Sequence, residues 1–388
     1  MSATLLTPRA RSAFQNRLRH WFEQNSRDLP WRHTNDPYLI WVSEVMLQQT
    51  QVKTVIPYFQ KFVAEYPDIL TLANASLNDV LRHWEKMGYY SRARNLHTAA
   101  RQLVRDADGV VPPDYPSFRK LPGVGDYIAS AVLSIAFGQP HAVVDGNTKR
   151  VLSRLFLIDA PANHSSSTAV FKKLAEEILD HGDPGLFNQA MMELGATVCK
   201  PRNPACDECP VKKHCKAFRA GQQDEYPIRI ERRKTPKYHI AVGVVYKGDK
   251  ILITRRKEKG LLGGLWEFPG GKVRKEESAA EACKREIEEE VNLDVEVTDH
   301  VTHVDHAYSH FKIGVDVFAC RYLAGKVKLN GPIDHRWILV EDTAHYPFPA
   351  VNHKIFPHLK IRDVSRQTEK QKGRDAGSLT GCKNTRDS

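Results

Sequence analysis

Four cysteines in one short stretch constrain the folding of this chain more than any other feature of its sequence. They are Cys199, Cys206, Cys209 and Cys215, with the spacing Cys-x6-Cys-x2-Cys-x5-Cys. The first residues of the chain lack the apolar segment of a signal peptide, so we expect a cytoplasmic protein whose thiols stay reduced. Thiolates this close together then indicate a metal centre. The spacing alone is compatible with zinc and with a [4Fe–4S] cluster.

The charge balance indicates a polyanionic partner. The 388 residues include 57 Lys and Arg against 46 Asp and Glu, a formal net charge of +11. Such an excess favours nucleic acid, anionic lipid or a phosphorylated substrate. No run of about 18 apolar residues occurs, which excludes a membrane-spanning helix. Basic residues also flank the cysteines, where they either contact phosphates or are ordinary solvated charges: Lys200, Arg202, Lys212, Lys213 and Lys216.

The hydrophobic periodicity changes along the chain and predicts two domains of different class. Before the cysteines, apolar residues recur at helical spacing over Phe14–Gln24, Trp41–Gln51, Pro57–Glu65, Leu77–Lys86, Ala93–Asp106, Tyr127–Phe137 and Thr148–Phe156. After a basic segment containing proline, the pattern predicts strands over Ile240–Tyr246, Ile251–Arg255 and Ile313–Tyr322 and a helix over Ser278–Val291. We therefore predict a mostly α domain at residues 1–225, a linker at 226–238, an α+β domain at 239–362 and a disordered tail at 363–388.

A glycine-containing turn lies between two of the expected helices, at Leu121-Pro122-Gly123-Val124-Gly125. Gly123 and Gly125 permit a tight turn whose backbone N–H groups point outward with the positive end of the next helix. A helix-hairpin-helix motif of this form binds DNA phosphates without reading the base sequence. By itself, the turn is equally compatible with a purely structural connection.

Two carboxylates are candidates for catalysis. Asp145 lies at the expected start of a helix, where it is either an N-cap or a carboxylate held toward the hairpin. Glu44 shares a helix side with Ile40 and Leu47, so it is either an exposed helical residue or a partly desolvated acid with a raised pKa. Cleavage of a glycosidic bond through an oxocarbenium-like state requires one protonated and one ionised carboxyl group.

The order of these motifs resembles that of a known family. The Glu44 helix, the hairpin, the Asp145 turn and the four cysteines follow one another as in the helix-hairpin-helix DNA glycosylases. The segments Leu29-Pro30-Trp31-Arg32, 43–52 and 88–96 resemble the MutY-type adenine DNA glycosylases. The resemblance implies a [4Fe–4S] cluster rather than zinc, and duplex DNA with A:8-oxoguanine or A:G mispairs as the partner. We accordingly expect a monomeric, nucleoid-associated enzyme with no membrane partner.

The resemblance also implies roles for the matching residues. Glu44 protonates the adenine ring and then activates water, Asp145 stabilises the positively charged sugar, Tyr127 supports this sugar, and Asn147 positions the groups around it. Endonuclease III-type enzymes have a catalytic lysine where Tyr127 stands, and without an amine no Schiff base forms. We therefore expect a monofunctional glycosylase, with a bifunctional lyase and a lesion-binding scaffold as the alternatives. The expected adenine pocket contains Trp31, Arg32, Gln49 and Glu193, and the expected 8-oxoguanine side contains Thr50, Met87, Tyr89 and Ser309.

A pattern of glycine, arginine and glutamates in the second half resembles the Nudix box. Its residues are Gly271, Glu277, Arg285, Glu286, Glu289 and Glu290, and Asn292 replaces the usual glycine in a position where asparagine tolerates the left-handed end of a helix. Three of the glutamates share one helix face, where like charges repel. A divalent cation explains this arrangement better than a solvated acidic stripe. We therefore expect Glu277, Glu286, Glu289 and Glu290 to bind Mg²⁺.

The flanks of this box resemble MutT, the hydrolase of oxidised guanine nucleotides, at Ile240–Val245 and Phe348–Asn352. MutY-type enzymes carry such a domain here, where it recognises 8-oxoguanine in DNA, and their Ser-His loop matches Ser309 and His310. We predict an α-helical glycosylase domain with an iron–sulfur loop, followed by an α+β Nudix-like domain, that excises adenine mispaired with 8-oxoguanine. Hydrolysis of 8-oxo-dGTP by the second domain is a further hypothesis.

Overall fold

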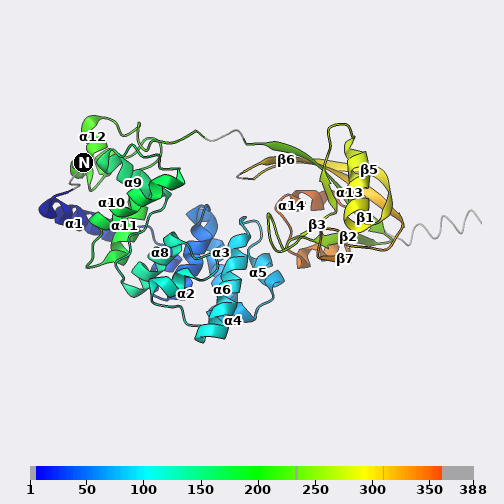
Figure 1. Ribbon diagram of the computed structural model, residues 1–388, viewed down its shortest axis with the longest axis horizontal. Coiled ribbons are helices and arrows are strands. Elements are labelled where there is room, and N and C mark those ends of the chain that lie inside the picture. The colour runs from blue at the N-terminus through cyan, green and yellow to red at the C-terminus, as the bar shows by residue number, and fades with distance from the viewer. Residues whose placement is uncertain (1–5, 232–234, 309, 361–388) are drawn as a thin grey trace, which may run out of the picture. The chain divides into compact units, whose positions relative to one another are not determined.

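The computed structural model describes residues 6–231, 235–308 and 310–360, and the chain forms two compact units. The first unit contains the chain up to His83 and from Ser91 to Arg233, and the second contains Trp84–Tyr90 and the chain from Lys234 onward. Helices make up the first unit, and a sheet with a helix packed on it dominates the second (Figure 1). The predicted fold classes, mostly α followed by α+β, are confirmed.

The helices of the first unit are α1 (Pro8–Asn25), α2 (Pro37–Leu47), α3 (Val52–Glu65), α4 (Ile69–Asn74), α5 (Leu77–His83), α6 (Ser91–Ala107), α7 (Tyr115–Arg119), α8 (Asp126–Phe137), α9 (Gly146–Phe156), α10 (Thr168–Ile178), α11 (Pro184–Thr197) and α12 (Lys216–Ala220). The helix predicted over Trp41–Gln51 is wrong at both ends. α2 begins after Asp36, whose side chain accepts a hydrogen bond from the N–H of Tyr38 at 2.7 Å. It ends at Leu47, because Gln48 leaves the helical conformation and Gln49 has a left-handed φ of 56°.

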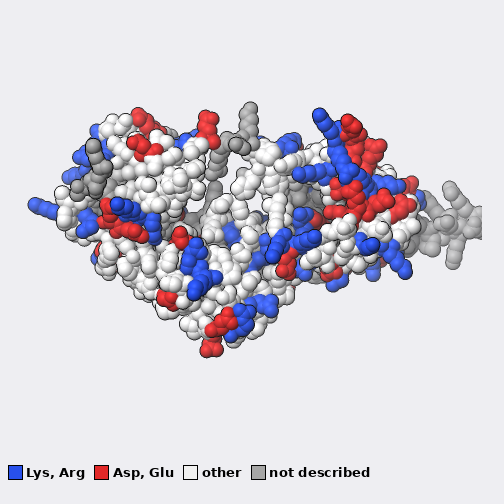
Figure 2. Space-filling model, in the orientation of Figure 1, with Lys and Arg blue, Asp and Glu red and all other residues white. Residues whose placement is uncertain are grey.

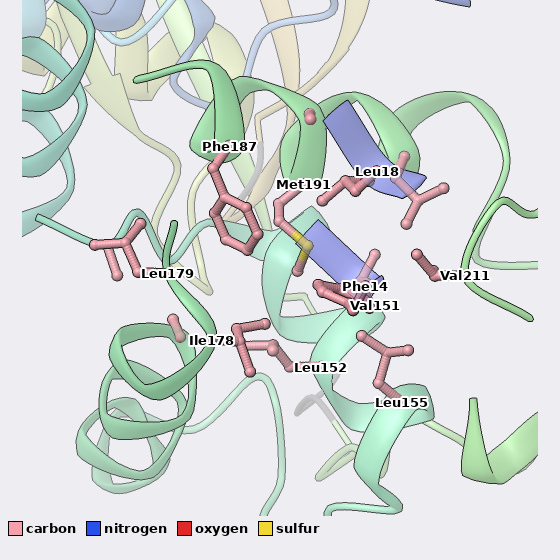
Figure 3. Close-up of a cluster of buried hydrophobic side chains, with 14 of the residues drawn as sticks. Phe14, Leu18, Val151, Leu152, Leu155, Ile178, Leu179, Phe187, Met191 and Val211 are labelled. Atoms are coloured by element: carbon pink, nitrogen blue, oxygen red, sulfur yellow. The ribbon is translucent and has the colours of Figure 1, made fainter. Parts of the chain in front are cut away.

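One hydrophobic core joins α1, α9, α10 and α11. Phe14 and Leu18 of α1 lie beside Phe187 and Met191 of α11, and Leu152 of α9 belongs to the same cluster (Figure 3). Burial of such a side chain contributes about 1.5–3 kcal/mol, so this cluster holds the four helices firmly together. The start of α9 and one side of α11 carry the functional residues described below, which the core therefore fixes relative to each other.

A mixed sheet forms the second unit. Its strands are β1 (Lys237–Lys247), β2 (Lys250–Arg255), β3 (Trp266–Glu267), β4 (Gly270–Lys272), β5 (Asp294–Ala307), β6 (Lys312–Ala324) and β7 (Asp334–Leu339). The order is β3-β2-β1-β6-β5, with β4 paired to β1 and β7 to β2. β1 and β6 are parallel and the other pairs are antiparallel. The predicted strands Ile240–Tyr246 and Ile251–Arg255 lie within β1 and β2, which are joined by a tight turn where Gly248 has a φ of 65°.

Helix α13 (Ala279–Val291) packs on one face of this sheet. Its Ile287 and Cys283 contact β1 at Gly243, where an added Cβ would lie 2.4 Å from Ile287 Cδ1, so only glycine permits this close approach. The helix begins with a capping box between Ser278 and Glu281 and ends at Asn292, which has the expected left-handed conformation with φ 57°. The short helix α14 (Asn352–Ile355) contributes to the core on the opposite face. None of the helices in the described part of the chain is long and apolar enough to cross a membrane.

Candidate active site

A cavity of about 150 Å³ in the first unit brings together most of the residues expected at the catalytic site. Its lining comes from the loop before α2, from α2 itself, and from the starts of α8 and α9 and one side of α11. The expected residues that line it are Trp31, Arg32, Glu44, Thr50, Tyr127, Asp145, Asn147 and Glu193. These residues are far apart in the sequence, so the fold assembles one site from several helix ends.

Glu44 is buried in the wall of this cavity, with 4% of its surface exposed. The hydroxyl of Tyr127 donates a short hydrogen bond to Glu44 Oε2. Burial raises the pKa of Glu44 to about 7; the bond from Tyr127 opposes this rise, and the charge of Asp145 adds to it. Burial also holds the pKa of Tyr127 well above 10, so the phenol stays protonated. Glu44 is therefore able to carry a proton near neutral pH, as a general acid must.

Asp145 is the N-cap of α9, and its two oxygens are held by different groups. Oδ1 accepts from the backbone N–H of Thr148 at 2.6 Å, and Oδ2 accepts from Asn147 Nδ2 at 2.9 Å. The N-cap interpretation of Asp145 is thus correct, and the same geometry points its carboxylate at the cavity. A side-chain oxygen in this position supplies a partner for a backbone N–H group that has none within the helix. The cavity thus contains two carboxyl groups in different surroundings, Glu44 buried beside Tyr127 and Asp145 at the start of α9.

Behind Asn147, Arg150 connects this site to the cysteine loop. Its Nη2 donates to Asn147 Oδ1 at 2.8 Å and to the carbonyl of Gly195 at 2.7 Å, and its Nε donates to the carbonyl of Cys199 at 2.7 Å. Arg150 is buried, so these hydrogen bonds replace its hydration. Gly195 is required here, because an added Cβ would lie 2.6 Å from Asn147 Cβ.

Glu193 is buried between two arginines at the other end of the cavity. Arg27 donates from Nε and Nη2 to its two oxygens at 2.7 Å each, and Arg32 Nη2 donates at 2.8 Å. Burial by itself would raise the pKa of Glu193, but the hydrogen bonds from Arg27 and Arg32 outweigh it and lower the pKa to about 2. Glu193 is therefore ionised, with its position fixed by a bidentate pair.

Sequence reasoning missed several residues of the cavity. Arg27 lies just before the Leu29–Arg32 motif. The only sequence signal for a role of Arg27 in the cavity was its position next to that motif. Gln189 and Met192 line the cavity from α11, one turn or less before Glu193, and helical spacing around a predicted pocket residue would have found them. Met192 Sδ lies 3.8 Å from the Tyr127 hydroxyl.

The other predicted substrate residues are distributed differently from the expectation. Thr50, expected on the 8-oxoguanine side, lines the cavity that contains Glu44. Gln49, expected in the adenine pocket, is exposed and does not belong to the lining of that cavity. Met87 and Tyr89 belong to the second unit, and His310 is exposed there. Ser309 lies outside the described residues.

The hairpin turn joins α8 to α7, a short helix that was not predicted. Gly123 has a φ of 79°, and an added Cβ would lie 2.7 Å from Asn95 Cβ, so both backbone conformation and space require glycine. Gly125 is the N-cap of α8. The first turn of α8 therefore offers unpaired N–H groups to an anion, the arrangement that binds a phosphate.

The four cysteines lie on the loop between α11 and α12, all half-buried. Three of them, Cys199, Cys209 and Cys215, pack against the core of Phe14 and its neighbours. Burial and the neighbouring thiols raise the pKa of Cys209 to about 12 and also raise the pKa of Cys206 and Cys215. Close thiols of this kind become thiolates when a metal binds. The donor set and its shielded position fit an iron–sulfur cluster.

Arg154, on α9, holds the start of this loop. Its Nη1 lies 3.3 Å from Cys199 Sγ and donates to the carbonyl of Lys200 at 2.7 Å, and its Nε donates to the carbonyl of Tyr226 at 2.9 Å. Lys200 and Arg202 themselves are exposed. Their side chains are therefore available to phosphates, while the loop that carries them is fixed from beneath.

In the second unit, the glutamates of the Nudix box are paired within the chain. Acidic side chains gather over α13 (Figure 2). Arg285 donates to Glu277 at 2.6 and 2.9 Å, to Glu286 at 2.8 Å and to Glu289 at 3.2 Å. Arg285 thus offsets part of the repulsion between Glu286 and Glu289 without a cation, so the repulsion between these two glutamates does not by itself require a cation.

Glu290 is separate from this pairing and faces a second cavity, of about 460 Å³. Burial raises the pKa of Glu290 to about 7, and the nearby charge of Glu267 adds to the rise. Glu267 itself accepts from Arg256 Nη1 at 2.7 and 2.8 Å. Glu286, Asn352 and Tyr308 also line this cavity, and among the residues that the structure describes the buried hydroxyl of Tyr308 has no hydrogen-bond partner.

Three family descriptions match successive parts of the chain. Residues 42–177 match the HhH-GPD superfamily of base excision DNA repair proteins, and residues 199–215 match the iron–sulfur binding domain of endonuclease III. Residues 241–358 match the NUDIX domain. The cavity with Glu44 and Asp145, the cysteine loop and the second unit each fall within or next to one of these matches.

Relatives of known activity cover nearly the whole chain. The adenine DNA glycosylase of Mus musculus is 34% identical over 399 residues, which cover 89% of this chain and 77% of that protein. The adenine DNA glycosylase of Buchnera aphidicola is 30% identical and covers 89% of this chain and 97% of that protein. Among solved structures, a thermostable thymine-DNA glycosylase is similar with a TM-score of 0.50 and 31% identity, covering 54% of this chain and 97% of that chain.

Proposed function

Since this chain belongs to the adenine DNA glycosylases, which excise adenine in base excision repair, we propose that its substrate is adenine mispaired with 8-oxoguanine or guanine in duplex DNA. The observation that carries the proposal is the cavity that holds a buried Glu44, with a pKa of about 7, together with Asp145. Its volume of about 150 Å³ suits a single base. The base is unreachable inside a duplex, so it must be flipped out, which costs a few kcal/mol of unstacking.

Glu44 acts first, as the general acid. Its proton passes to a ring nitrogen of the flipped adenine while the bond between base and sugar breaks, so that the base leaves as a neutral molecule. The hydrogen bond from Tyr127 keeps the Glu44 carboxyl group in place during this transfer. Once ionised, Glu44 accepts a proton from the water that attacks the sugar.

Asp145 stabilises the sugar as it becomes positively charged. Its carboxylate is ordered by Thr148 and Asn147 before the reaction, so little reorganisation is needed when the charge develops. Asn147 is in turn held by Arg150. The two carboxyl groups therefore have different roles: Glu44 transfers protons, and Asp145 provides the negative charge that stabilises the sugar.

The end of the cavity near Glu193 recognises the base. The ionised Glu193 presents acceptor oxygens, and Arg27 and Arg32 present donors, on side chains that hold one another in place. Adenine offers an exocyclic amine as donor and ring nitrogens as acceptors, which complement this set. Trp31, buried beside Phe59 with ring centroids 5.4 Å apart, supplies an apolar wall.

Contacts outside the cavity position the duplex. The hairpin and the basic cysteine loop bind the DNA backbone, and Cys199, Cys206, Cys209 and Cys215 hold a [4Fe–4S] cluster that keeps this loop folded. We assign Met87, Tyr89, Ser309 and His310, all in the second unit, to recognition of the opposite base, and we expect the enzyme to act as a monomer. No described residue lining the cavity is a lysine, which favours a monofunctional enzyme over a lyase.

A substrate panel tests this function. Duplexes with A:8-oxoguanine, A:G, A:T and C:8-oxoguanine pairs are incubated with excess enzyme, and released adenine and strand breaks are measured before and after alkali. We expect adenine release from A:8-oxoguanine fastest, from A:G more slowly and from A:T not at all, with strand breaks only after alkali. Equal release from A:8-oxoguanine and A:T would disprove the proposed specificity, and breaks before alkali would indicate a lyase.

A second function, Mg²⁺-dependent hydrolysis of 8-oxo-dGTP, is supported by one observation. The cavity in the second unit is lined by Glu286, Glu290 and Asn352, so carboxylates and an amide face a space large enough for a nucleoside. Mg²⁺ would be held by Glu286 and Glu290, joined by Glu277 and Glu289 if these exchange Arg285 for the ion. The test measures pyrophosphate release from 8-oxo-dGTP by the full chain carrying Glu44→Gln, with Glu290→Gln as the inactive control. Absence of pyrophosphate release in the presence of Mg²⁺ would disprove this second function. The proposed adenine excision by the first unit would still stand.

A further inference from the structure

The guanidinium of Arg92, on α6, binds the carboxyl end of α2. Its Nη1 donates to the carbonyl oxygens of Val45 at 2.9 Å, Met46 at 2.7 Å and Gln48 at 2.7 Å, and its Nη2 donates to Thr50 Oγ1 at 3.1 Å. Only 8% of the residue is exposed. The last carbonyls of a helix have no partner within that helix and attract positive charge. One side chain from α6 therefore supplies the partners that the end of α2 lacks.

The loop that Arg92 holds has an unfavourable backbone conformation. Gln49 has a left-handed φ of 56°, which costs about 1–2 kcal/mol in a residue with a side chain. Such a conformation persists only where its surroundings enforce it. Arg92 binds the residues on both sides, Gln48 and Thr50, and Thr50 forms part of the wall of the catalytic cavity. The shape of that wall thus depends on a side chain that does not itself line the cavity.

The same face of α6 contacts the hairpin. Asn95 follows Arg92 by one helical turn, so the two residues lie on one side of the helix. Its Cβ occupies the space beside Gly123, where an added Cβ would lie only 2.7 Å away. A small cavity of about 30 Å³ between them is lined by Gln48, Arg92, Asn95 and Gly123. α6 therefore contacts both the turn that binds the DNA backbone and the loop beside the adenine cavity.

We propose that Arg92 is a positioning residue for adenine excision, which holds the Gln48–Thr50 loop at a fixed distance from the hairpin so that the flipped base meets Glu44 in reactive geometry. This inference rests on excision of adenine by the chain and goes beyond the residues that line the cavity. Without the guanidinium, the loop is free to leave the left-handed conformation at Gln49. A displacement of about 1 Å near reacting groups can reduce a rate about 100-fold.

The experiment compares Arg92→Leu and Arg92→Lys with the wild-type protein and with Arg101→Leu. Arg101 lies on the exposed side of the same helix and is a matched control for the loss of one positive charge. Lysine keeps the charge but replaces the planar set of donors with one ammonium group, which cannot serve all four acceptors. For each protein, the active fraction is first titrated with an A:8-oxoguanine duplex. The single-turnover rate constant is then measured with enzyme in excess, so that it is independent of that fraction.

We expect the rate constant to fall about 100-fold in Arg92→Leu and by an intermediate factor in Arg92→Lys, with Arg101→Leu unchanged and with affinity for undamaged duplex retained in all three. A merely structural role would lower the active fraction and leave the rate constant of the remaining enzyme unchanged. Rate constants within about twofold of the wild type in both Arg92 variants would therefore overturn the proposal. If the wild-type protein itself released no adenine, the proposed function would fail instead, so the two failures are distinguishable.

Discussion

The buried Glu44 should make the stability of the protein depend on pH, and replacement by glutamine should remove that dependence. Glu44 has a pKa of about 7 in the folded protein, because burial disfavours its charge, against an ordinary value of 4.5. Below pH 4.5 the group is mainly protonated in both the folded and the unfolded chain, so it does not lower the free energy of unfolding. As the pH rises from 4.5 to 7, the unfolded chain ionises first, so stability is lost progressively.

The magnitude follows from the difference between these two pKa values. At about 1.36 kcal/mol for each pKa unit, the ionised Glu44 costs the fold about 3 kcal/mol above pH 7. Glutamine has the same shape, can still accept the hydrogen bond from Tyr127 and carries no charge at any pH. Glu44→Gln should therefore have the stability of the wild type at pH 4.5 and exceed it by up to about 3 kcal/mol at pH 8.

Denaturant unfolding at a series of pH values measures this difference, and Glu23→Gln is the control because Glu23 is exposed on α1. The control should show no gain in stability at any pH. A difference between Glu44→Gln and the wild type that stays constant from pH 4.5 to 8 would show that Glu44 titrates normally. In that case the general-acid role would lose its physical basis.

Three further outcomes are expected. Tyr127→Phe removes the hydrogen bond that lowers the pKa of Glu44, so the pH at which single-turnover excision declines should move upward, and an unchanged profile would contradict this contact. Lys200→Ala and Arg202→Ala should each weaken DNA binding for all sequences and reduce the slope of log K against log salt by about one, whereas an unchanged slope would place these side chains away from the phosphates. Anaerobically purified protein should be brown and contain about four iron atoms per chain, and a colourless protein containing zinc would contradict the cluster assignment.

Many residues of the candidate site could be predicted from the sequence, because the positions of residues on helices and the order of the motifs indicate them. Asp145 before Gly146 predicted a helix N-cap, and its carboxylate indeed begins α9. The apolar side shared by Glu44 and Ile40 offered desolvation as the alternative to an exposed helical residue, and Glu44 is buried, so the exposed alternative is wrong. Helix periodicity and capping depend on neighbouring residues, so a single sequence shows them directly.

Contacts between distant segments were not predictable in this way. Arg27 reaches Glu193 across the fold, and Arg285 pairs with Glu286 and Glu289, two of the three glutamates that local spacing presented as an unpaired stripe. The end of α2 at Leu47 depends on Arg92, a residue of another helix. In each case a long cationic side chain makes the contact that the sequence did not predict. Tertiary packing, rather than the position in the sequence, sets the direction of that side chain.

The central claim is that Glu44 and Asp145 together break the bond between adenine and its sugar. The most direct measurement is the release of free adenine, by chromatography under single-turnover conditions, from an A:8-oxoguanine duplex treated with the wild type, Glu44→Gln or Asp145→Asn. We predict no release by Glu44→Gln with affinity for the mispair within a small factor of the wild type, and severely reduced release by Asp145→Asn, because an amide cannot offset the cationic sugar. Adenine release by Glu44→Gln at the wild-type rate would contradict the account.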